Sequence, residues 1–399
     1  MSLTRRRLFQ FAVRDHSPAG DWITGRGREA AVAEGSLEFG QRAASSGSNS
    51  NLIRIASNEN PLGPGQHVLD VIVGKFPEAS RYPFNAQQRE PVFVDAIANK
   101  FGVTRDMVTL GAGSGEILVN AVRAFTSSTK PFVAADPTWE QPRQMAEKIG
   151  TPVRAVAVDK NLRIDVDKMV EASKGAGLVF FCNPNNPTGT VLGASVISDF
   201  VKRVRAASPD TIIVLDEAYH DYVTDPNYKT AADIAKSTPK VLVARTMSKA
   251  YGMAGMRIGY AFGDKEAVSA LNRFRMPYGI NLPGIAAATV ALGNQPHIDA
   301  ERKRNTDVKA FTVKALEQMG FKATDSQTNF IFVNLNRPAK PFRDACAQQG
   351  VIVGRDFPPF EKTHCRISIG TMAEMQKAVD VFKKVLGSAT STSNQARQR

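Results

Sequence analysis

The sequence predicts an α/β fold, with a large domain built on a mixed, mostly parallel sheet and a smaller α+β domain beside it. Short apolar runs alternate with segments whose apolar residues recur with the helical period of 3.6, the pattern of strands joined by helices. Over roughly the last hundred residues this alternation gives way to a different mixture of strands and helices. The length of 399 residues, 43% of them hydrophobic, is also more typical of two domains than of one.

The strands of the large domain are expected within five short apolar runs, at residues 131–136, 152–158, 177–183, 211–219 and 240–246. Continuous apolar runs of this kind are typical of strands that are covered on both faces. Segments between them, such as residues 194–208, carry the helical period. Because parallel neighbours need a crossover helix, this order predicts a largely parallel sheet.

The smaller domain is expected from apolar runs at residues 329–335, 350–354 and 364–370, with a helix over 373–386 beside them. We place residues 51–83 in the same domain and expect it to span 291–386 in the C-terminal part of the chain.

The remaining boundaries follow from composition. Residues 84–290 are expected to form the large domain. Residues 1–50 end in a Ser/Gly/Asn linker and are expected to be a leader or arm, with at most a short helix over 20–40. Residues 387–399 have the low complexity of a disordered tail.

The charge balance favours anionic small molecules as partners. The chain has 51 lysines and arginines against 38 aspartates and glutamates, which gives a net charge of +13. The basic residues are scattered and no patch interleaves them with aromatic residues, so no nucleic-acid partner is expected. No apolar run approaches the roughly 20 residues that span a bilayer, so no membrane association is expected. Cys182, Cys346 and Cys365 have no zinc-site spacing, and we expect reduced thiols and no metal site.

The leader contains TRRRLF at residues 4–9, which resembles a twin-arginine export signal. Such a signal needs an apolar stretch after the arginines, and here Arg14, Asp15 and His16 interrupt it at once. A basic leader on a cytoplasmic protein is therefore favoured, and export to the periplasm stays open as the alternative.

Unusual residues follow the expected strands at their carboxyl ends, where open α/β sheets bind ligands. Asp216 and Glu217 come directly after an apolar run, where an acid is costly unless a cation meets it. The segment NPNNPTG, residues 183–189, follows another strand. The segment GAGSG, residues 111–115, offers backbone N–H groups that suit a phosphate. Lys249 stands at the mouth of a further strand.

Each of these features is ambiguous by itself. Asp216 and Glu217 are compatible with a helix cap or a salt bridge, and an isolated lysine such as Lys249 is most often a surface residue. The segment GAGSG is compatible with a plain turn, and it is not a dinucleotide-binding GxGxxG because Glu116 takes the place of the third glycine. The prediction depends on their combination.

Together these residues meet the needs of one cofactor, pyridoxal phosphate. The cofactor needs an amine for its aldehyde, a carboxylate for its pyridinium nitrogen, donors for its 3-oxygen, a helix N-terminus and a cation for its phosphate, and a flat side chain against its ring. The candidates are Lys249 for the amine, Asp216 for the carboxylate, and Asn186 with Tyr219 for the donors to the 3-oxygen. The phosphate cradle would be Ala112, Gly113 and Ser114 with Thr246 and Arg257, and Trp139 would be the flat side chain against the ring. The glycines Gly252 and Gly255 are expected to allow a tight turn that brings Arg257 back to the phosphate.

The same segments identify a family resemblance. NPNNPTG, LDEAYHDY (215–222) and TMSKAYGMAGMRIGY (246–260) resemble, in order and spacing, the motifs of class I/II aminotransferases of fold type I. The chain is most similar to the histidinol-phosphate aminotransferase branch, whose signatures also include NENPLGP (58–64) and RYP (81–83). The resemblance covers about residues 52–386 and implies a pyridoxal-phosphate enzyme that moves an amino group between a small-molecule amino donor and a 2-oxo acid such as 2-oxoglutarate.

The resemblance also implies individual roles. Lys249 is implied as the Schiff-base lysine and acid/base catalyst, and Asp216 and Tyr219 as catalytic partners of the ring. Tyr82 is similar to a tyrosine that reaches the phosphate from a neighbouring subunit, which implies a homodimer with shared active sites. The implied substrate ligands are Arg366, which would clamp an α-carboxylate, with Arg355 and Asn60.

Other functions remain open at this point. A decarboxylase, lyase or cyclase would use the same scaffold, because the reaction depends on which Cα bond stands perpendicular to the ring. A non-enzymatic regulator is the alternative of another class, but residues 1–50 are too short for a DNA-binding helix pair. The donor is open between an α-amino acid and a phosphorylated amine such as histidinol phosphate.

Overall fold

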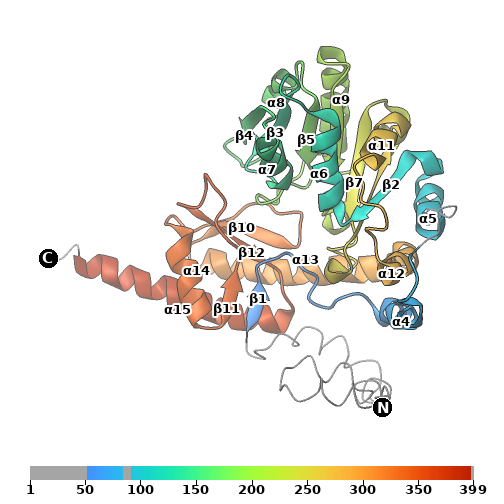
Figure 1. Cartoon of the computed structure of the whole chain (residues 1–399). Helices are drawn as coiled ribbons and strands as arrows, with labels where there is room; N and C mark the ends of the chain where they lie inside the picture. The colour runs from blue at the N-terminus through green and yellow to red at the C-terminus, as the bar shows by residue number, and fades with distance from the viewer. Residues whose placement is uncertain (1–51, 84–90, 397–399) are drawn as a thin grey trace, which may run out of the picture. The chain divides into compact units, whose positions relative to one another are not determined.

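The computed structural model of the chain describes residues 52–83 and 91–396 (Figure 1). The expectations for the leader, including the export-like segment and the short helix, lie outside the described residues, as do residues 397–399.

The described residues form strands, α-helices and single turns of 3₁₀ helix. The strands are β1 (Ile53–Ile55), β2 (Val108–Ala112), β3 (Phe132–Asp136), β4 (Val153–Ala157), β5 (Leu178–Cys182), β6 (Ile212–Asp216), β7 (Val241–Thr246), β8 (Ile258–Gly263), β9 (Lys322–Ala323), β10 (Phe330–Asn334), β11 (Val351–Val353) and β12 (His364–Ser368). The helices are α4 (Gln66–Gly74), α5 (Pro91–Phe101), α6 (Ser114–Phe125), α7 (Gln141–Lys148), α8 (Val166–Ala172), α9 (Ala194–Ala207), α10 (Ala232–Ser237), α11 (Lys265–Asn272), α12 (Leu282–Leu292), α13 (Gln295–Gln318), α14 (Ala339–Gln348) and α15 (Met372–Ala396). The 3₁₀ turns are η2 (Phe76–Glu78), η3 (Arg105–Met107), η4 (His220–Tyr222) and η5 (Ala254–Met256).

Seven strands form the larger sheet, in the order β2-β8-β7-β6-β5-β3-β4. Strands β7, β6, β5, β3 and β4 pair in parallel, whereas β8 is antiparallel to both of its neighbours. The predicted mixed, mostly parallel sheet is therefore confirmed.

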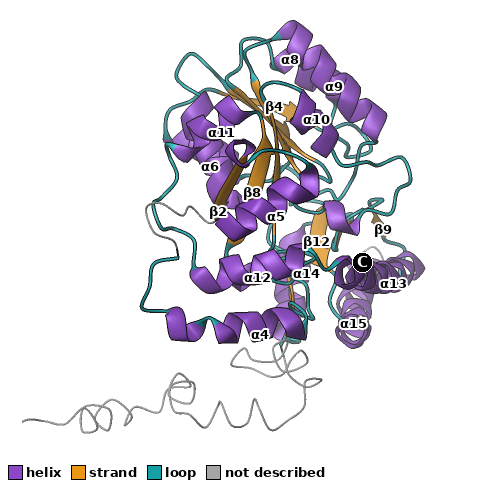
Figure 2. Cartoon of the chain, turned by 90° about the vertical axis from the view of Figure 1, so that its right-hand side faces the viewer, coloured by secondary structure: helices purple, strands orange, loops and turns teal. Residues whose placement is uncertain are grey.

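Side-chain alternation along the strands divides the core of the larger lobe into two layers. On β5, Leu178 and Phe180 belong to the layer under α6, α7 and α11, while Val179 and Phe181 belong to the layer that packs against α8, α9 and α12. Successive strand residues point to opposite faces, so a continuous apolar run is what a sheet covered on both faces requires. Figure 2 shows the sheet with helices on either side.

The second lobe has two small sheets. Strand β10 pairs antiparallel with β12 and with β9, and β1 pairs in parallel with β11. A separate hydrophobic cluster, which includes Ile331, Phe342 and Phe382, joins these strands to α13, α14 and α15. The long helix α13 runs from α12 in the larger lobe to the strands of the smaller one (Figure 1). The predicted smaller α+β part is confirmed.

Two details differ from the expected domain boundaries. Helix α4 was expected in the small domain, but Val68 and Ile72 join the core of the larger sheet because α4 packs on α12. Helix α15 continues to Ala396, so residues 387–396 are helical where the sequence predicts a disordered tail. The last residue of that helix in the hydrophobic cluster is Leu386, so the extension continues a helix already anchored by packing.

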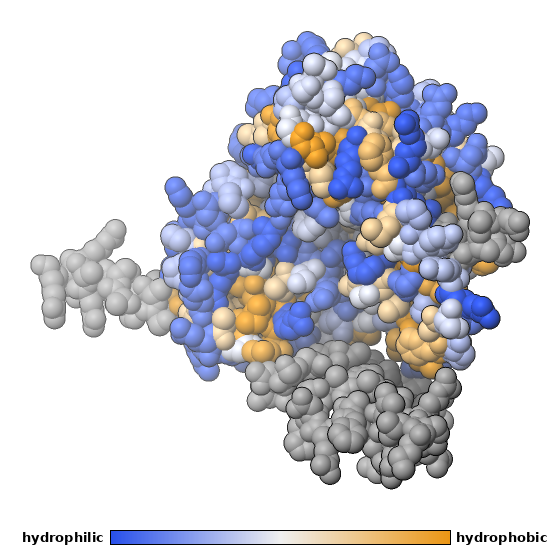
Figure 3. Space-filling view, in the orientation of Figure 1, coloured by the Kyte–Doolittle hydropathy of each residue, from blue (hydrophilic) through white to orange (hydrophobic). Residues whose placement is uncertain are grey.

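Polar side chains cover much of the face seen in Figure 3, with apolar surface where α4 lies. Exposed apolar residues on and near α4 include Val73, Phe76 and Tyr82. Over the described ranges, no helix combines the length and apolarity that a bilayer crossing needs.

Candidate active site

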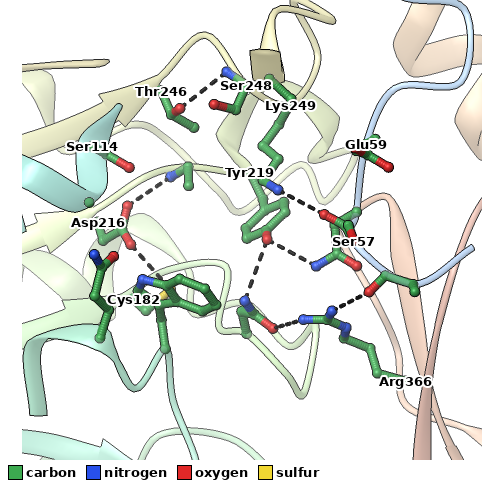
Figure 4. A pocket seen from close by; sticks show the side chains of 18 of the residues that line it. Ser57, Glu59, Ser114, Cys182, Asp216, Tyr219, Thr246, Ser248, Lys249 and Arg366 are labelled. Atoms are coloured by element: carbon green, nitrogen blue, oxygen red, sulfur yellow. Dashed lines mark hydrogen bonds between the residues drawn. The ribbon is translucent and has the colours of Figure 1, made fainter. Parts of the chain in front are cut away.

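A cavity of about 590 Å³ lies where the parallel strands of the larger sheet end, and residues of both lobes line it (Figure 4). Asp216 ends β6 and Thr246 ends β7, while Arg366 comes from β12 of the second lobe. Among the predicted site residues, the cavity lining includes Ser114, Trp139, Asn186, Asp216, Tyr219, Thr246, Lys249, Arg257, Arg355 and Arg366.

Lys249 enters the cavity from the turn that follows β7. Its Nζ donates to the carbonyl of Ser57 at 3.2 Å and lies 5.6 Å from the centre of the Tyr219 ring. Burial lowers the pKa of Lys249 to about 8, and the positive charges of Arg366 and Arg257 contribute to the shift. A lysine with this pKa has an appreciable fraction of free amine near neutral pH, which a nucleophile needs.

The tight turn behind Lys249 depends on one of the two glycines that were expected to allow it. Gly252 has φ of +67°, and a Cβ there would lie 2.1 Å from the carbonyl carbon of Gly63. Gly255 has open space around it and no left-handed backbone, so the turn does not require glycine at that position. Arg257 itself takes the left-handed conformation, with φ of 55°.

Asp216 is 3% exposed, and its carboxylate faces the cavity. The described residues give it only weak partners: the backbone N–H of Ala218 at 3.2 Å and the thiol of Cys182, with sulfur 3.8 Å from Oδ2. Burial raises the pKa of Asp216 to about 7. A buried carboxylate without a cationic partner is suited to a ligand that brings a protonated ring nitrogen. Its neighbour Glu217 instead forms the ordinary salt bridge that the sequence also allowed, with Arg245 at 2.8 Å.

A hydrogen-bond network connects Tyr219 to the second lobe. The Tyr219 hydroxyl accepts from the side-chain amides of Asn58 at 3.0 Å and Asn186 at 3.5 Å. Asn186 in turn accepts from Arg366 at 2.8 Å. Burial raises the pKa of Tyr219 above its usual value, so this hydroxyl stays protonated and can donate to an acceptor in the cavity.

Groups suited to a phosphate gather around the N-terminus of α6. Ser114 and Gly115 begin this 12-residue helix and line the cavity, which directs their backbone N–H groups and the positive end of the helix dipole toward it. Thr246 and Arg257 line the same region, and the Arg257 guanidinium donates to Ser248 Oγ at 3.3 Å and to the Ala254 carbonyl at 2.9 Å. Its described hydrogen-bond partners are all uncharged, which leaves its charge available for an anion.

Three arginines of the second lobe line the other end of the cavity: Arg343, Arg355 and Arg366. Arg366 is 6% exposed and donates only to neutral oxygens among the described residues, Asn186 Oδ1 and the carbonyl of Ala56 at 2.6 Å. Its Nε is buried without a partner in the described part of the chain. Burial lowers the pKa of Arg366 to about 10, and the charge of Arg355 adds to the effect. A buried guanidinium without a carboxylate is costly, and an anionic substrate would satisfy it.

Four predicted residues lie outside the cavity lining: Ala112, Gly113, Tyr82 and Asn60. Ala112 donates its N–H to Glu116 at 2.6 Å, so this amide is already used. Gly113 has φ of +80° and packs on Arg257, where a Cβ would lie 2.3 Å from Nη2. Tyr82 is 76% exposed and packs on Tyr278, with ring centres 4.8 Å apart.

The assignment of Asn60 to substrate binding is not supported by its position. Its Nδ2 donates to the carbonyl of Ala250 at 3.0 Å, and its Oδ1 accepts from the N–H of Leu62 at 2.9 Å. Both ends of the amide therefore stabilise the turn. In the same motif Asn58 lines the cavity and contacts Tyr219, so the role expected of Asn60 fits Asn58 better.

Sequence reasoning missed several lining residues: Ser57, Asn58, Glu59, Ser248 and Arg343. The motif NENPLGP was a signal for the first part of this set, and within it Asn58 lines the cavity whereas Asn60 does not. Arg343 stands on α14 with no distinguishing pattern around it, so no local signal could have found it.

The residues present fit pyridoxal phosphate. One cavity holds an amine with a lowered pKa, a carboxylate without a cation, a protonated hydroxyl, a helix N-terminus beside an arginine, and the indole of Trp139. Within the described residues, no cluster of three histidine, cysteine or acidic side chains offers a metal site.

Comparisons with known proteins agree with this geometry. The family model described as aminotransferase class I and II matches residues 50–382. The chain is 34% identical to histidinol-phosphate aminotransferase of Moorella thermoacetica over 84% of its length and 86% of that protein. It is 33% identical to histidinol-phosphate aminotransferase 2 of Pseudomonas fluorescens over 85% of its length and 90% of that protein. The crystal structure of histidinol-phosphate aminotransferase from Sinorhizobium meliloti in complex with pyridoxal-5'-phosphate is 25% identical, with a TM-score of 0.77 over 85% of this chain and 91% of that one.

Proposed function

This chain belongs to the aminotransferase class I and II family, and from that premise we propose that it transfers the amino group of a phosphorylated amine of the histidinol-phosphate kind to a 2-oxo acid such as 2-oxoglutarate. It is a pyridoxal-phosphate-dependent enzyme, and the family assignment favours transamination over decarboxylation, elimination or cyclisation.

The observation that carries the donor assignment is the group of three arginines at the substrate end of the cavity. Arg366 is buried without a carboxylate partner among the described residues, and Arg343 and Arg355, which are paired with Asp356 and Glu140, line the same end. One guanidinium is enough for an α-carboxylate, whereas a phosphate dianion can engage several. The names of the two relatives point to the same class of donor.

Pyridoxal phosphate, when bound, supplies an aldehyde and a protonated ring that withdraws electrons from the substrate Cα. Lys249 would provide the amine for the aldehyde, because its Nζ lies inside the cavity with a pKa of about 8. With a substrate in the cavity, a free Nζ would be placed to take a proton from the substrate Cα and to return it. The same nitrogen would thus serve as nucleophile and as base and acid.

Asp216 would keep the ring nitrogen protonated. Its carboxylate is buried, and the positive charge of a pyridinium would lower its raised pKa, so each charged group would stabilise the other. Tyr219 and Asn186 would donate to the 3-oxygen, and Trp139 would cover one face of the ring. Arg257 and the N-terminus of α6 would hold the phosphate and fix the position of the ring relative to Lys249.

A donor panel tests this proposal. The protein loaded with pyridoxal phosphate is mixed in turn with histidinol phosphate, histidinol, histidine and glutamate, and loss of the visible absorbance band is followed in a single half-reaction. We expect histidinol phosphate to exceed histidinol by at least about 100-fold in kcat/KM, because phosphate is the group that the arginines recognise. Equal rates for the two would contradict the proposed donor, while leaving the aminotransferase assignment in place.

We also propose that the enzyme is a homodimer in which Tyr82 completes the site of the partner subunit. Tyr82 and Met276 are 76% and 68% exposed, and Val73 and Phe76 add apolar surface near them. Exposed apolar surface of this extent is typical of an interface. Mixing two inactive variants, Lys249→Ala and Tyr82→Ala, should restore activity through hybrid dimers that contain one intact site. Full activity in a protein that sediments as a monomer would contradict this proposal.

For location we propose the cytoplasm, because the short apolar stretch after the arginines of the twin-arginine-like segment is interrupted at Arg14, Asp15 and His16. Fractionation of cells that express the full chain tests it, and periplasmic enzyme that is lost on changing Arg5 and Arg6 to lysine would contradict it.

A further inference from the structure

Arg355, at the rim of the cavity, is already engaged by an acid from the opposite lobe. Its Nη2 donates to Oε1 of Glu140, which is the residue before α7 in the larger lobe. Arg355 lines the cavity and lies between β11 and β12 of the smaller lobe, so this ion pair links the two lobes beside the cavity. Its side chain is 48% exposed, and that of Glu140 is 30% exposed.

The rest of the Arg355 guanidinium is held in place as well. Nη1 donates to the carbonyl of Asp356 at 2.9 Å, and the group lies 4.3 Å from the centre of the Phe357 ring. The Phe357 ring is also 4.6 Å from the Arg366 guanidinium, so the two arginines share one aromatic side chain and point to one region of the cavity. Their charges repel each other, since Arg355 contributes to the lowered pKa of Arg366.

The two arginines therefore differ in what they offer to a ligand. Arg366 has only neutral partners in the described part of the chain, and any anion that reaches it gains a charge. Arg355 has an intramolecular carboxylate, so a ligand anion must replace Glu140 to use it. Because Glu140 belongs to the same chain, its carboxylate has a higher effective concentration at Arg355 than a carboxylate on a free ligand. The ligand carboxylate is also no stronger as a hydrogen-bond acceptor.

From this geometry we propose that Glu140 is a specificity-determining residue that reserves Arg355 for dianionic phosphate groups. A second carboxylate on a ligand does not displace Glu140, because both groups carry a single negative charge and the ligand therefore gains no electrostatic advantage. A phosphate monoester brings up to two charges and three oxygens, and it bridges Arg355 and Arg366 while Glu140 turns to solvent. The inference rests on the proposed function, since it concerns the second anionic group of that enzyme's substrate.

The test compares four proteins with two probes. Wild type, Glu140→Gln, Arg355→Gln and the double variant are titrated by calorimetry in the cofactor-loaded form, first with inorganic phosphate and then with succinate. With Glu140 present, we expect Arg355→Gln to weaken phosphate binding about 10-fold, because phosphate loses one charge-assisted contact. Succinate binding should weaken less than twofold, because succinate does not use Arg355. In the Glu140→Gln background, Arg355→Gln should weaken both probes, and Glu140→Gln by itself should tighten succinate about three- to fivefold.

Glu147→Gln is the matched control. Glu147 lies on α7, the helix that Glu140 precedes, and pairs with Arg143 at 2.9 Å outside the cavity lining, so this change removes an equal charge without freeing Arg355. A gain in succinate affinity with Glu147→Gln would show that overall charge is responsible and would overturn the proposal. Equal dependence of phosphate and succinate binding on Arg355 in wild type would also overturn the proposal. Weaker succinate binding by Glu140→Gln would do the same, because the ion pair would then serve only to link the two lobes.

Failure of this inference can be told apart from failure of the proposed function. Uptake of pyridoxal phosphate is measured on the same samples, and lack of uptake contradicts the function alone. The comparison of four proteins remains valid without the cofactor, because the phosphate cradle at α6 contributes equally to all of them.

Discussion

Arg366 of the smaller lobe donates to Oδ1 of Asn186 in the larger lobe at 2.8 Å, and the amide of Asn186 faces the hydroxyl of Tyr219 at 3.5 Å. The arginine expected to bind the substrate anion is therefore connected through one side chain to the donors expected at the cofactor's 3-oxygen. An anion that draws Arg366 toward itself alters the network that holds Tyr219, which couples substrate binding to the ring.

The first prediction concerns Arg366. Arg366→Lys should raise KM for the phosphorylated donor roughly 10- to 100-fold, because lysine cannot reproduce two parallel charge-assisted bonds that are worth about 1.5–3 kcal/mol each. Steady-state kinetics with both substrates measures the effect. Arg337→Lys is the control, since Arg337 lies over Phe321, outside the cavity lining. Unchanged KM for both substrates would show that the anion subsite is elsewhere.

The second prediction uses the raised pKa of Asp216. A carboxyl whose folded pKa is about 7 and whose unfolded pKa is 3.8 contributes stability below pH 3.8 that is lost as the pH rises through 7. The apoprotein with Asp216→Asn should therefore be more stable than wild type at pH 8, by up to about 4 kcal/mol, and no more stable at pH 4. Urea unfolding at the two pH values measures this difference, and an equal effect at both would contradict the assignment.

Asp221→Asn is the control with the opposite sign. Burial would raise the pKa of Asp221, but His220, Arg245 and Lys100 together lower it below its usual value. Its stabilising contribution is present above the unfolded pKa of 3.8 and is lost only as the pH falls below it, so this variant should lose a similar amount of stability at pH 8 and at pH 4.

The third prediction separates the two asparagines of the NENPLGP motif. Asn58→Ala removes the nearer donor to the Tyr219 hydroxyl and should lower kcat about 10-fold while shifting the visible band of the bound cofactor. Asn60→Ala should cost about 1–3 kcal/mol in the free energy of unfolding, because the Ala250 carbonyl loses its donor, with KM unchanged. The reverse assignment of effects would restore Asn60 to the substrate site.

The fourth prediction concerns pH. A lysine of pKa about 8 has about a quarter of its amine free at pH 7.5, whereas one at the ordinary 10.5 has about one part in a thousand. The rate at which the apoprotein forms a visible band with pyridoxal phosphate should rise with pH and level off above about 8. A rate that still rises tenfold per pH unit at pH 9 would contradict the lowered pKa.

Strands that are buried on both faces were predictable, because such strands consist of a continuous apolar run in the sequence. Strand β8 (Ile258–Gly263) was not expected as a strand, since the same residues stood at the end of the lysine motif and include glycines. Gly259 is needed there because a Cβ would lie 2.2 Å from the Ser114 nitrogen, a contact that only the folded chain shows. The three residues of β1 pair with β11 near the other end of the chain, and no local pattern marks them.

The cofactor end of the site was more predictable than the substrate end. Lys249, Asp216 and Asn186 follow strands directly, so the sheet brings them together at its carboxyl edge. Arg343 pairs with Asp356 within the smaller lobe, and Glu140 reaches Arg355 from the larger lobe, and neither contact is signalled by the residues around it in the sequence. The choice between Asn58 and Asn60 depended on a left-handed backbone at Asn58, with φ of 56°, which the sequence does not reveal.

The central claim, that Lys249 holds the cofactor, has one direct test: borohydride reduction of the loaded protein followed by peptide mapping of the trapped pyridoxyl group. Lys309 is an internal control, because burial lowers its pKa to about 8 as well, while it lies outside the cavity lining and donates to the carbonyls of Ser326 and Thr328. If a lowered pKa alone selected the reactive lysine, both would carry the label. The geometry of the cavity predicts label on Lys249 alone, and label on Lys309, on any other lysine, or on none would contradict the account.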